Sequence, residues 1–167
     1  MKIIQNYNDI GINYQGGDLK INHFELTSLT DCPKFITGHY YSNNNQLKSL
    51  VGGPQQVDGD YLSSGNSLTD LVGCASHIGG TLYIKRTNIT SLIGIHKIIK
   101  SCQKIFLNTE NITQGGIGLL LINDLFSISD GDLPFKIIRS YIGQGTKGMM
   151  ECSKELIANG YAQFAKL

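Results

Sequence analysis

The sequence predicts an α/β fold in which about five turns of short parallel strands stack into a solenoid that a small α-helical cap follows. The first observation is an apolar column with a period of 21 residues, formed by Leu26, Leu47, Leu68 and Ile89. The same period holds for Leu29, Leu50, Leu71 and Leu92, and for Ile36, Val57, Ile78 and Ile99. The second is a matching column of small residues, Gly38, Gly59 and Gly80. The third is the loss of this period at Gly115-Gly116, which marks a break between two kinds of structure.

Each turn contains a short strand with a polar residue at the bend that follows it. The third unit reads Leu82-x-Ile84-x-x-Thr87-x-Ile89, which fits the leucine-rich-repeat pattern L-x-L-x-x-N-x-L with Thr at the Asn position. Asn45 and Asn66 fill that position in earlier units. An Asn there can bond backbone groups that the bend leaves unpaired, and stacking buries the apolar face that one turn cannot bury alone. Two inserted residues are expected after Ile99, before the strand resumes at Ile105.

One unit reads Leu47-Lys-Ser-Leu50-Val-Gly-Gly-Pro54-Gln-Gln-Val57-Asp-Gly59-Asp-Tyr61. It resembles the short leucine-rich repeats of bacteriophage-encoded proteins, roughly N-x-L-x-S-L-x-G-x-P-x-x-V-x-G-x-F, and the short repeats of some bacterial effector proteins. The resemblance covers about residues 17–114, although Tyr and Ser fill the two strand core positions in the middle units. It implies a leucine-rich-repeat fold and a virus–host setting, but no single activity.

The chain divides into three predicted parts: an N-terminal cap over 1–16, the repeat solenoid over 17–114 and a helical cap over 115–167. Apolar spacing predicts helices over 134–142 and 147–158. Pro134 suits a first helical position, Thr146 could cap the start of the second helix, and Gly160 could end it.

Alternate strand residues should face away from the core. On this register the outward column is Lys20, Tyr41, Leu62, Tyr83 and Phe106. The four apolar members would form a stripe of roughly 14 Å, since parallel strands lie ~4.8 Å apart. The polar columns beside it are His39, Asp60, Thr81 and Lys104 on one side, and Asn43, Ser64, Lys85 and Asn108 on the other. Lys85-Arg86 is the only adjacent basic pair. The competing interpretation is that the C-terminal helices or a second copy of the chain cover this stripe.

Composition excludes several classes of function. The net charge is +1 and only 16% of residues are charged, so the clustered cations that duplex nucleic acid requires are absent and no nucleic-acid partner is expected. No apolar run approaches the length of a membrane span, and the first residues lack the apolar core of a secretory signal, so we expect no membrane partner. A cytoplasmic location follows, in the host cytoplasm if the protein is phage-encoded.

No catalytic residue, cofactor site or metal site is predicted. The segment Gly143-Gln-Gly145-Thr-Lys147-Gly148 matches G-x-G-x-x-G, but a predicted helix precedes it where a phosphate-binding loop needs a strand. Cys74 and His77 could form a nucleophilic pair, yet no acid or amide is placed to orient the histidine. Cys32 and Cys74 share a repeat column two turns apart, too far for a disulfide.

The sequence therefore predicts a non-catalytic protein-binding module that uses its strand face. The candidate contact residues are Tyr41, Leu62, Tyr83, Phe106, His39, Lys85 and Arg86. By resemblance, the partner would be a host or antiviral-defence protein. Two alternatives stay open: a structural or self-assembling repeat protein, and an enzyme or nucleotide binder that acts through Gly143–Met149. The oligomeric state is left undetermined.

Overall fold

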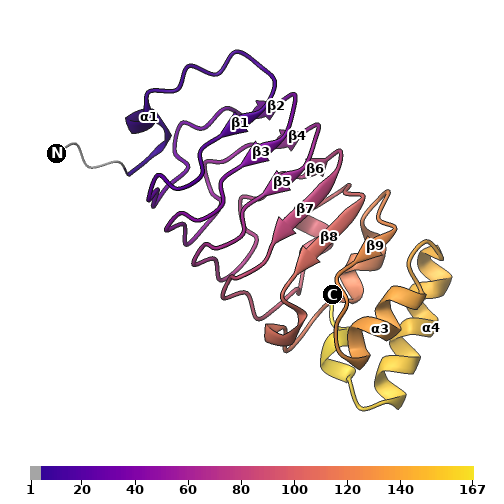
Figure 1. The fold of residues 1–167 in the computed structure, drawn as a ribbon. Coiled ribbons are helices and arrows are strands. Elements are labelled where there is room, and N and C mark those ends of the chain that lie inside the picture. The colour runs from indigo at the N-terminus through magenta and orange to yellow at the C-terminus, as the bar shows by residue number, and fades with distance from the viewer. Residues whose placement is uncertain (1–4) are drawn as a thin grey trace.

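The computed structural model describes residues 5–167, which form an α/β fold with two parallel sheets and a few helices (Figure 1). The larger sheet has six strands in the order β1 (Leu19–Lys20), β3 (Tyr40–Tyr41), β5 (Tyr61–Leu62), β7 (Thr81–Ile84), β8 (Lys104–Leu107) and β9 (Ser127–Ile128). The smaller sheet has the order β2 (Phe35–Ile36), β4 (Gln56–Val57) and β6 (His77–Ile78). All neighbouring strands are parallel, which confirms the predicted α/β class and its short parallel strands.

The strand register reproduces the spacing seen in the sequence. Tyr40 pairs with Tyr61, and Tyr61 pairs with Leu82, so each turn returns the chain to the same height in the sheet. The next partner of Leu82 is Ile105, which confirms the two-residue insertion. Ile105 then pairs with Ile128 in β9, so the larger sheet continues into the segment predicted as the helical cap.

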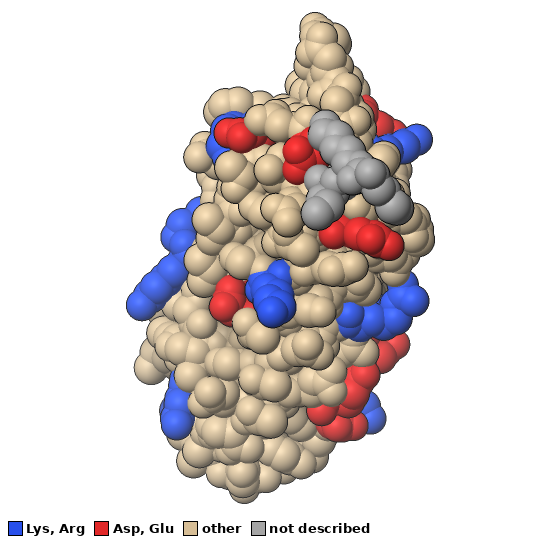
Figure 2. All heavy atoms as spheres, turned by 90° about the vertical axis from the view of Figure 1, so that its left-hand side faces the viewer, with Lys and Arg blue, Asp and Glu red and all other residues tan. Residues whose placement is uncertain are grey.

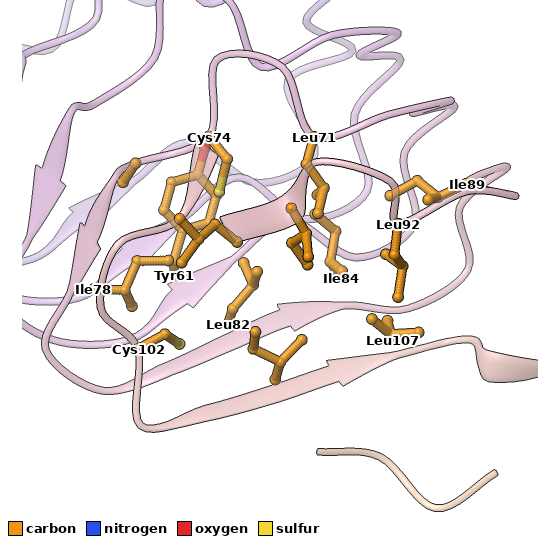
Figure 3. Packing of buried hydrophobic residues seen from close by; sticks show 14 of the residues in the cluster. Tyr61, Leu71, Cys74, Ile78, Leu82, Ile84, Ile89, Leu92, Cys102 and Leu107 are labelled. Atoms are coloured by element: carbon orange, nitrogen blue, oxygen red, sulfur yellow. The ribbon is translucent and has the colours of Figure 1, made fainter. Parts of the chain in front are cut away.

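Inward-facing side chains from both sheets form one buried cluster (Figure 3). Tyr61 and Leu82 contribute from the larger sheet, and Val57 and Ile78 contribute from the smaller one. The rings of Tyr40 and Tyr61 meet edge to face, with centroids 4.8 Å apart. Because each fully buried aliphatic side chain contributes about 1.5–3 kcal/mol, this repeated burial is the main source of stability.

Buried asparagines join successive turns at the bend after the strand. Asn45 accepts a hydrogen bond from Leu26 N–H at 3.1 Å, one turn back, and donates to the Ser42 carbonyl at 3.0 Å in its own turn. Asn66 repeats this arrangement, accepting from Leu47 N–H at 3.2 Å and donating to the Ser63 carbonyl of its own turn at 3.1 Å. It also donates to the Ser42 carbonyl, one turn back, at 3.0 Å. Both asparagines are buried, so their amides satisfy backbone groups that water does not reach.

Gly52 and Gly73, which lie 21 residues apart on the return path, are a steric requirement. Gly73 has a φ of 86°, and a Cβ at this position would lie 2.3 Å from the backbone nitrogen of Val51 in the preceding turn. Gly52 repeats both properties, with a φ of 89° and a Cβ contact of 2.9 Å to the Leu29 carbonyl oxygen. Only a residue without a Cβ allows the turns to stack this closely.

Helices lie mainly at the two ends of the stack (Figure 1). The helical segments are α1 (Tyr7–Ile10), α2 (Ile95–Ile98), η1 (Thr109–Asn111), η2 (Ile117–Leu121), α3 (Leu133–Ser140), α4 (Gly145–Ala158) and η3 (Ala162–Ala165). The two predicted C-terminal helices are confirmed as α3 and α4, and Pro134 lies in the first turn of α3. The expectation that Thr146 caps α4 is wrong, because Gln144 is the residue at the cap and Thr146 lies within the helix.

Replacing Asn66 with Ala is expected to lower the free energy of unfolding by roughly 1–3 kcal/mol. The substitution leaves the Leu47 N–H and the Ser63 carbonyl without their amide partner in the core. Chemical denaturation measures the change. Asn13→Ala is the control, because Asn13 is exposed and, among residues 5–167, its side chain bonds only to exposed Gln15. Equal effects of the two substitutions would contradict the role given to the buried amide.

Replacing Tyr61 with Phe is expected to raise the free energy of unfolding by about 1 kcal/mol. The Tyr61 hydroxyl is buried without a hydrogen-bond partner among the described residues. The Tyr40 hydroxyl, one turn earlier, lies 4.0 Å from the Cys32 Sγ, which donates to it. The residue equivalent to Cys32 in the next turn is Gly53, which has no side chain to offer the Tyr61 hydroxyl. Tyr40→Phe is the control and should not stabilise the protein. A loss of stability in Tyr61→Phe would show that the hydroxyl has a partner.

Candidate binding surface

The outward column of the larger sheet has the register that the sequence predicts. Tyr41 pairs with Leu62, Leu62 with Tyr83, and Tyr83 with Phe106. All four side chains are partly exposed, and the rings of Tyr83 and Phe106 stack with centroids 5.3 Å apart and 16° between their planes. In Figure 1, α3 and α4 lie beyond β9 at the C-terminal end of the stack, not in front of the strands that carry this column.

Lysine side chains lie over several of these aromatic rings. The Lys20 Nζ is 5.5 Å from the centroid of Tyr41, and the Lys85 Nζ is 5.7 Å from that of Phe106. A third pair joins Lys104 and Phe126 at 5.2 Å. Contacts of this length favour the charged ammonium through the negative face of the ring. The face therefore combines apolar and cationic groups.

Phe126 is an aromatic residue of this surface that sequence reasoning missed. It lies directly before β9, and its side chain is 59% exposed. Its backbone N–H donates to the Gln103 carbonyl, which places Phe126 beside the start of β8. The 21-residue period could not find it, because the register has already shifted by two residues at this point.

His39 forms part of a backbone ladder beside the column. The His39 N–H donates to Asp18 Oδ1 at 2.8 Å, and the Asp60 N–H donates to His39 Nδ1 at 2.9 Å. Asp60 Oδ1 in turn accepts from the Thr81 N–H at 2.7 Å. The Nδ1 of His39 must be unprotonated to accept its bond. The imidazole is therefore held in one orientation, with its ring 6.0 Å from that of Tyr41.

The side chains of the basic pair Lys85-Arg86 lie in two different places. The Lys85 side chain lies near Phe106, whereas the Arg86 Nη2 donates to Asn44 Oδ1 at 3.2 Å. Arg86 has a φ of 54°, and its backbone N–H is bonded to the Asn108 side chain, which fixes this turn. Of the two predicted cations, Lys85 adjoins the aromatic column and Arg86 lies at the bend beyond it.

A second apolar column was not singled out from the sequence. Val51, Val72 and Ile93 are exposed by 58%, 52% and 43%, and they follow one another at the repeat period on the return path. Val51 and Val72 border a groove of about 380 Å³ whose walls include Lys34 and Pro54. We call these three residues the aliphatic ridge. The 21-residue period was the signal that could have found them, since each directly precedes one of the equally spaced glycines Gly52, Gly73 and Gly94.

The glycine-rich segment lies between two helices. Gly143 occupies the turn after α3, and Gly145 begins α4, so the strand that a phosphate-binding loop requires is replaced by a helix. Gly148 packs closely inside α4, where a Cβ would approach the Gln144 Cβ to 2.4 Å. Within residues 5–167, no helix is long and apolar enough to cross a membrane.

The cysteines and histidines do not assemble into a reactive or metal-binding group in the part of the chain described. All four cysteines are free and buried. Cys74 lies in the core, whereas His77 is exposed on β6 with its Nδ1 2.9 Å from the Ser76 Oγ. No group of three or more His, Cys, Asp or Glu side chains among these residues could hold a metal ion.

Burial also suppresses the thiolate form of the cysteines. It raises the pKa of Cys32 and Cys102 to about 11 and that of Cys152 to about 12, and it raises the pKa of Cys74 further. Since the thiolate is the nucleophile, a raised pKa and a buried sulfur both oppose reaction. Sulfur chemistry on the native protein is therefore disfavoured at all four positions.

We expect the native protein to react with none of its thiols when treated with Ellman's reagent at about pH 8. Unfolding in guanidinium should expose all four, and the absorbance change should then correspond to four thiols per chain. A Cys152→Ser variant should lose one thiol only in the unfolded measurement. Rapid modification of one native thiol would identify a reactive cysteine and contradict this expectation.

Comparison with known proteins identifies no relative for this geometry. The chain matches no protein-family model, no curated protein and no solved structure. The resemblance of residues 17–114 to short phage repeats therefore stays an expectation that rests on its motif residues. What the surface binds has to be inferred from its own side chains, and their pattern is an exposed aromatic and cationic column on a parallel sheet.

Proposed function

We propose that the chain is a leucine-rich-repeat solenoid that binds another protein through the outward face of its larger sheet. The observation that carries the proposal is the column Tyr41, Leu62, Tyr83 and Phe106, which stays partly exposed along four adjacent strands. Protein interfaces are enriched in aromatic residues at their centre and in polar groups at their rim. Here His39, Lys85 and Arg86 supply polar groups beside the column.

The solenoid interpretation draws support from the repeat contacts. Strand partners recur at the repeat period, buried Asn45 and Asn66 hold equivalent bonds, and Gly52 and Gly73 make equivalent close contacts. Contacts of this kind between neighbouring turns are typical of repeat proteins. The resemblance to phage repeats suggests a host or antiviral-defence protein as the partner.

Self-assembly is the second candidate, and the aliphatic ridge is the observation that favours it. Val51, Val72 and Ile93 expose apolar side chains on a side of the molecule that the strand face does not include. Contiguous exposed apolar residues often mark contacts between proteins. The ridge therefore provides a natural comparison surface for the test of the strand face.

The triple variant Tyr41→Glu, Leu62→Glu, Tyr83→Glu is expected to lose its partner in affinity capture from a host-cell lysate. Hot-spot residues, which cluster at the centre of an interface, cost about 2 kcal/mol or more when truncated, and this is more than tenfold in affinity. Quantitative mass spectrometry measures the captured protein. The melting temperature should stay within a few degrees of the wild type, because these side chains lie outside the buried cluster.

The matched control is the ridge variant Val51→Glu, Val72→Glu, Ile93→Glu, which also adds three charges. It should capture the partner as well as the wild type does. Undiminished capture by the strand-face variant would refute the proposal. Light scattering of both variants separates the second candidate, because a dimer or larger assembly that only the ridge variant loses would assign the ridge to self-assembly.

A further inference from the structure

Charge is distributed unevenly along the strand face. The carboxylates Asp18 and Asp60 belong to the N-terminal half of the stack, where their Oδ1 atoms accept backbone N–H groups. In the C-terminal half, Lys85 directly follows β7 and Lys104 begins β8, with Arg86 at the adjacent bend. Figure 2, which views the N-terminal end, shows Lys, Arg, Asp and Glu scattered with neither sign gathered in one patch. Lys20, on β1, lies 4.0 Å from the Asp18 carboxylate, so the lysines of the face that have no carboxylate within ion-pair distance among residues 5–167 are those at β7–β8.

The carboxylates nearest to this region already have partners. Glu110 accepts a hydrogen bond from the Asn108 side chain. Its pKa is lowered first by its own backbone N–H and then by Asn108, and Lys85 contributes less. Asp130 is paired with Arg139 at the other edge. Neither Lys85 nor Lys104 forms an ion pair with a carboxylate among residues 5–167. Both ammonium groups thus lie over rings and can accept an anion from outside.

The two lysines lie on opposite sides of the aromatic pair. Lys104 begins β8 and is in register with Thr81, whereas Lys85 follows the last residue of β7. Four residues of strand separate these positions, which is about 13 Å along the strand direction. The stacked rings of Tyr83 and Phe106 lie between them. An extended chain on this face would meet a cation, an apolar centre and a second cation in turn.

The ring geometry discriminates between two classes of anionic ligand. Tyr83 and Phe106 stack on each other, so each ring covers one face of the other, and Lys85 lies near Phe106 as well. A nucleobase needs a free ring face on which to stack. Ring edges carry partial positive charge and are compatible with a neighbouring carboxylate. The arrangement favours a protein carboxylate over a single-stranded nucleic acid.

On the basis of the proposed function, we infer that the β7–β8 part of the face binds an acidic segment of a protein. The segment is extended, with an apolar side chain against Tyr83 and Phe106 and one carboxylate on each side of it. Lys85 and Lys104 bind these carboxylates while their ammonium groups stay over the rings of Phe106 and Phe126. Carboxylates about four residues apart match the spacing of the two lysines.

The test is a selection of random displayed decapeptides on the intact protein, followed by fluorescence polarisation with the enriched peptides. Acidic residues on both sides of an aromatic or aliphatic residue are the expected result. Binding should weaken more than tenfold in the double variant Lys85→Gln, Lys104→Gln. It should also weaken more than tenfold when NaCl is raised from about 50 mM to about 300 mM, because salt screens exposed charges. Lys48→Gln is the control, since Lys48 is exposed outside the strand face.

Three results would overturn the inference. Enrichment of neutral or basic peptides whose binding requires Tyr83 would rule out an acidic partner segment but would still support protein binding by the strand face. If no peptide whose binding depends on Tyr83 is enriched, the acidic partner is also ruled out. The capture experiment from lysate then tests the proposed function separately. Binding of fluorescein-labelled oligo(dT) that disappears in the double lysine variant would replace the protein segment with single-stranded nucleic acid.

Discussion

The hydrogen bonds of Asn45 and Asn66 are the constraint on which the stack depends. Each amide lies where the chain leaves the larger sheet, and it satisfies backbone groups of two successive turns at once. A bend buried in this position would otherwise leave polar groups without water or partner, at a cost of about 1–3 kcal/mol each. Because the bend is fixed, the next strand starts in register, and every column of side chains follows from that register.

The same register produces two apolar surfaces of different character. On the strand face, aromatic side chains alternate with core residues, and lysines from neighbouring positions fold over their rings. On the return path, the aliphatic ridge lies beside Gly52 and Gly73, which the close stacking requires. A polar, aromatic surface suits a specific and reversible partner, whereas the ridge lacks directional groups. This contrast is why the strand face is the stronger candidate for recognition.

The periodic part of this molecule was accessible from its sequence because each turn places the same position in the same environment. The inward columns, the two-residue insertion after Ile99, the parallel strands and the two C-terminal helices could all be predicted. β9 could not, because it contributes two residues after the period has been lost. The different directions of the Lys85 and Arg86 side chains could not be predicted either. They depend on the positive φ of Arg86 and on its hydrogen bonds to Asn44 and Asn108, which are far away in the sequence.

The insertion between β7 and β8 shows that the length of a turn and the register of its strand are separate variables. Two added residues are absorbed on the return path, while Tyr83 still meets Phe106 across the sheet. Loss or duplication of one whole unit would accordingly change the face by one strand spacing of ~4.8 Å without disturbing the units on either side. The length of the strand face therefore changes in steps of one unit. A longer face can arise by duplication of a unit, without new substitutions inside the existing units.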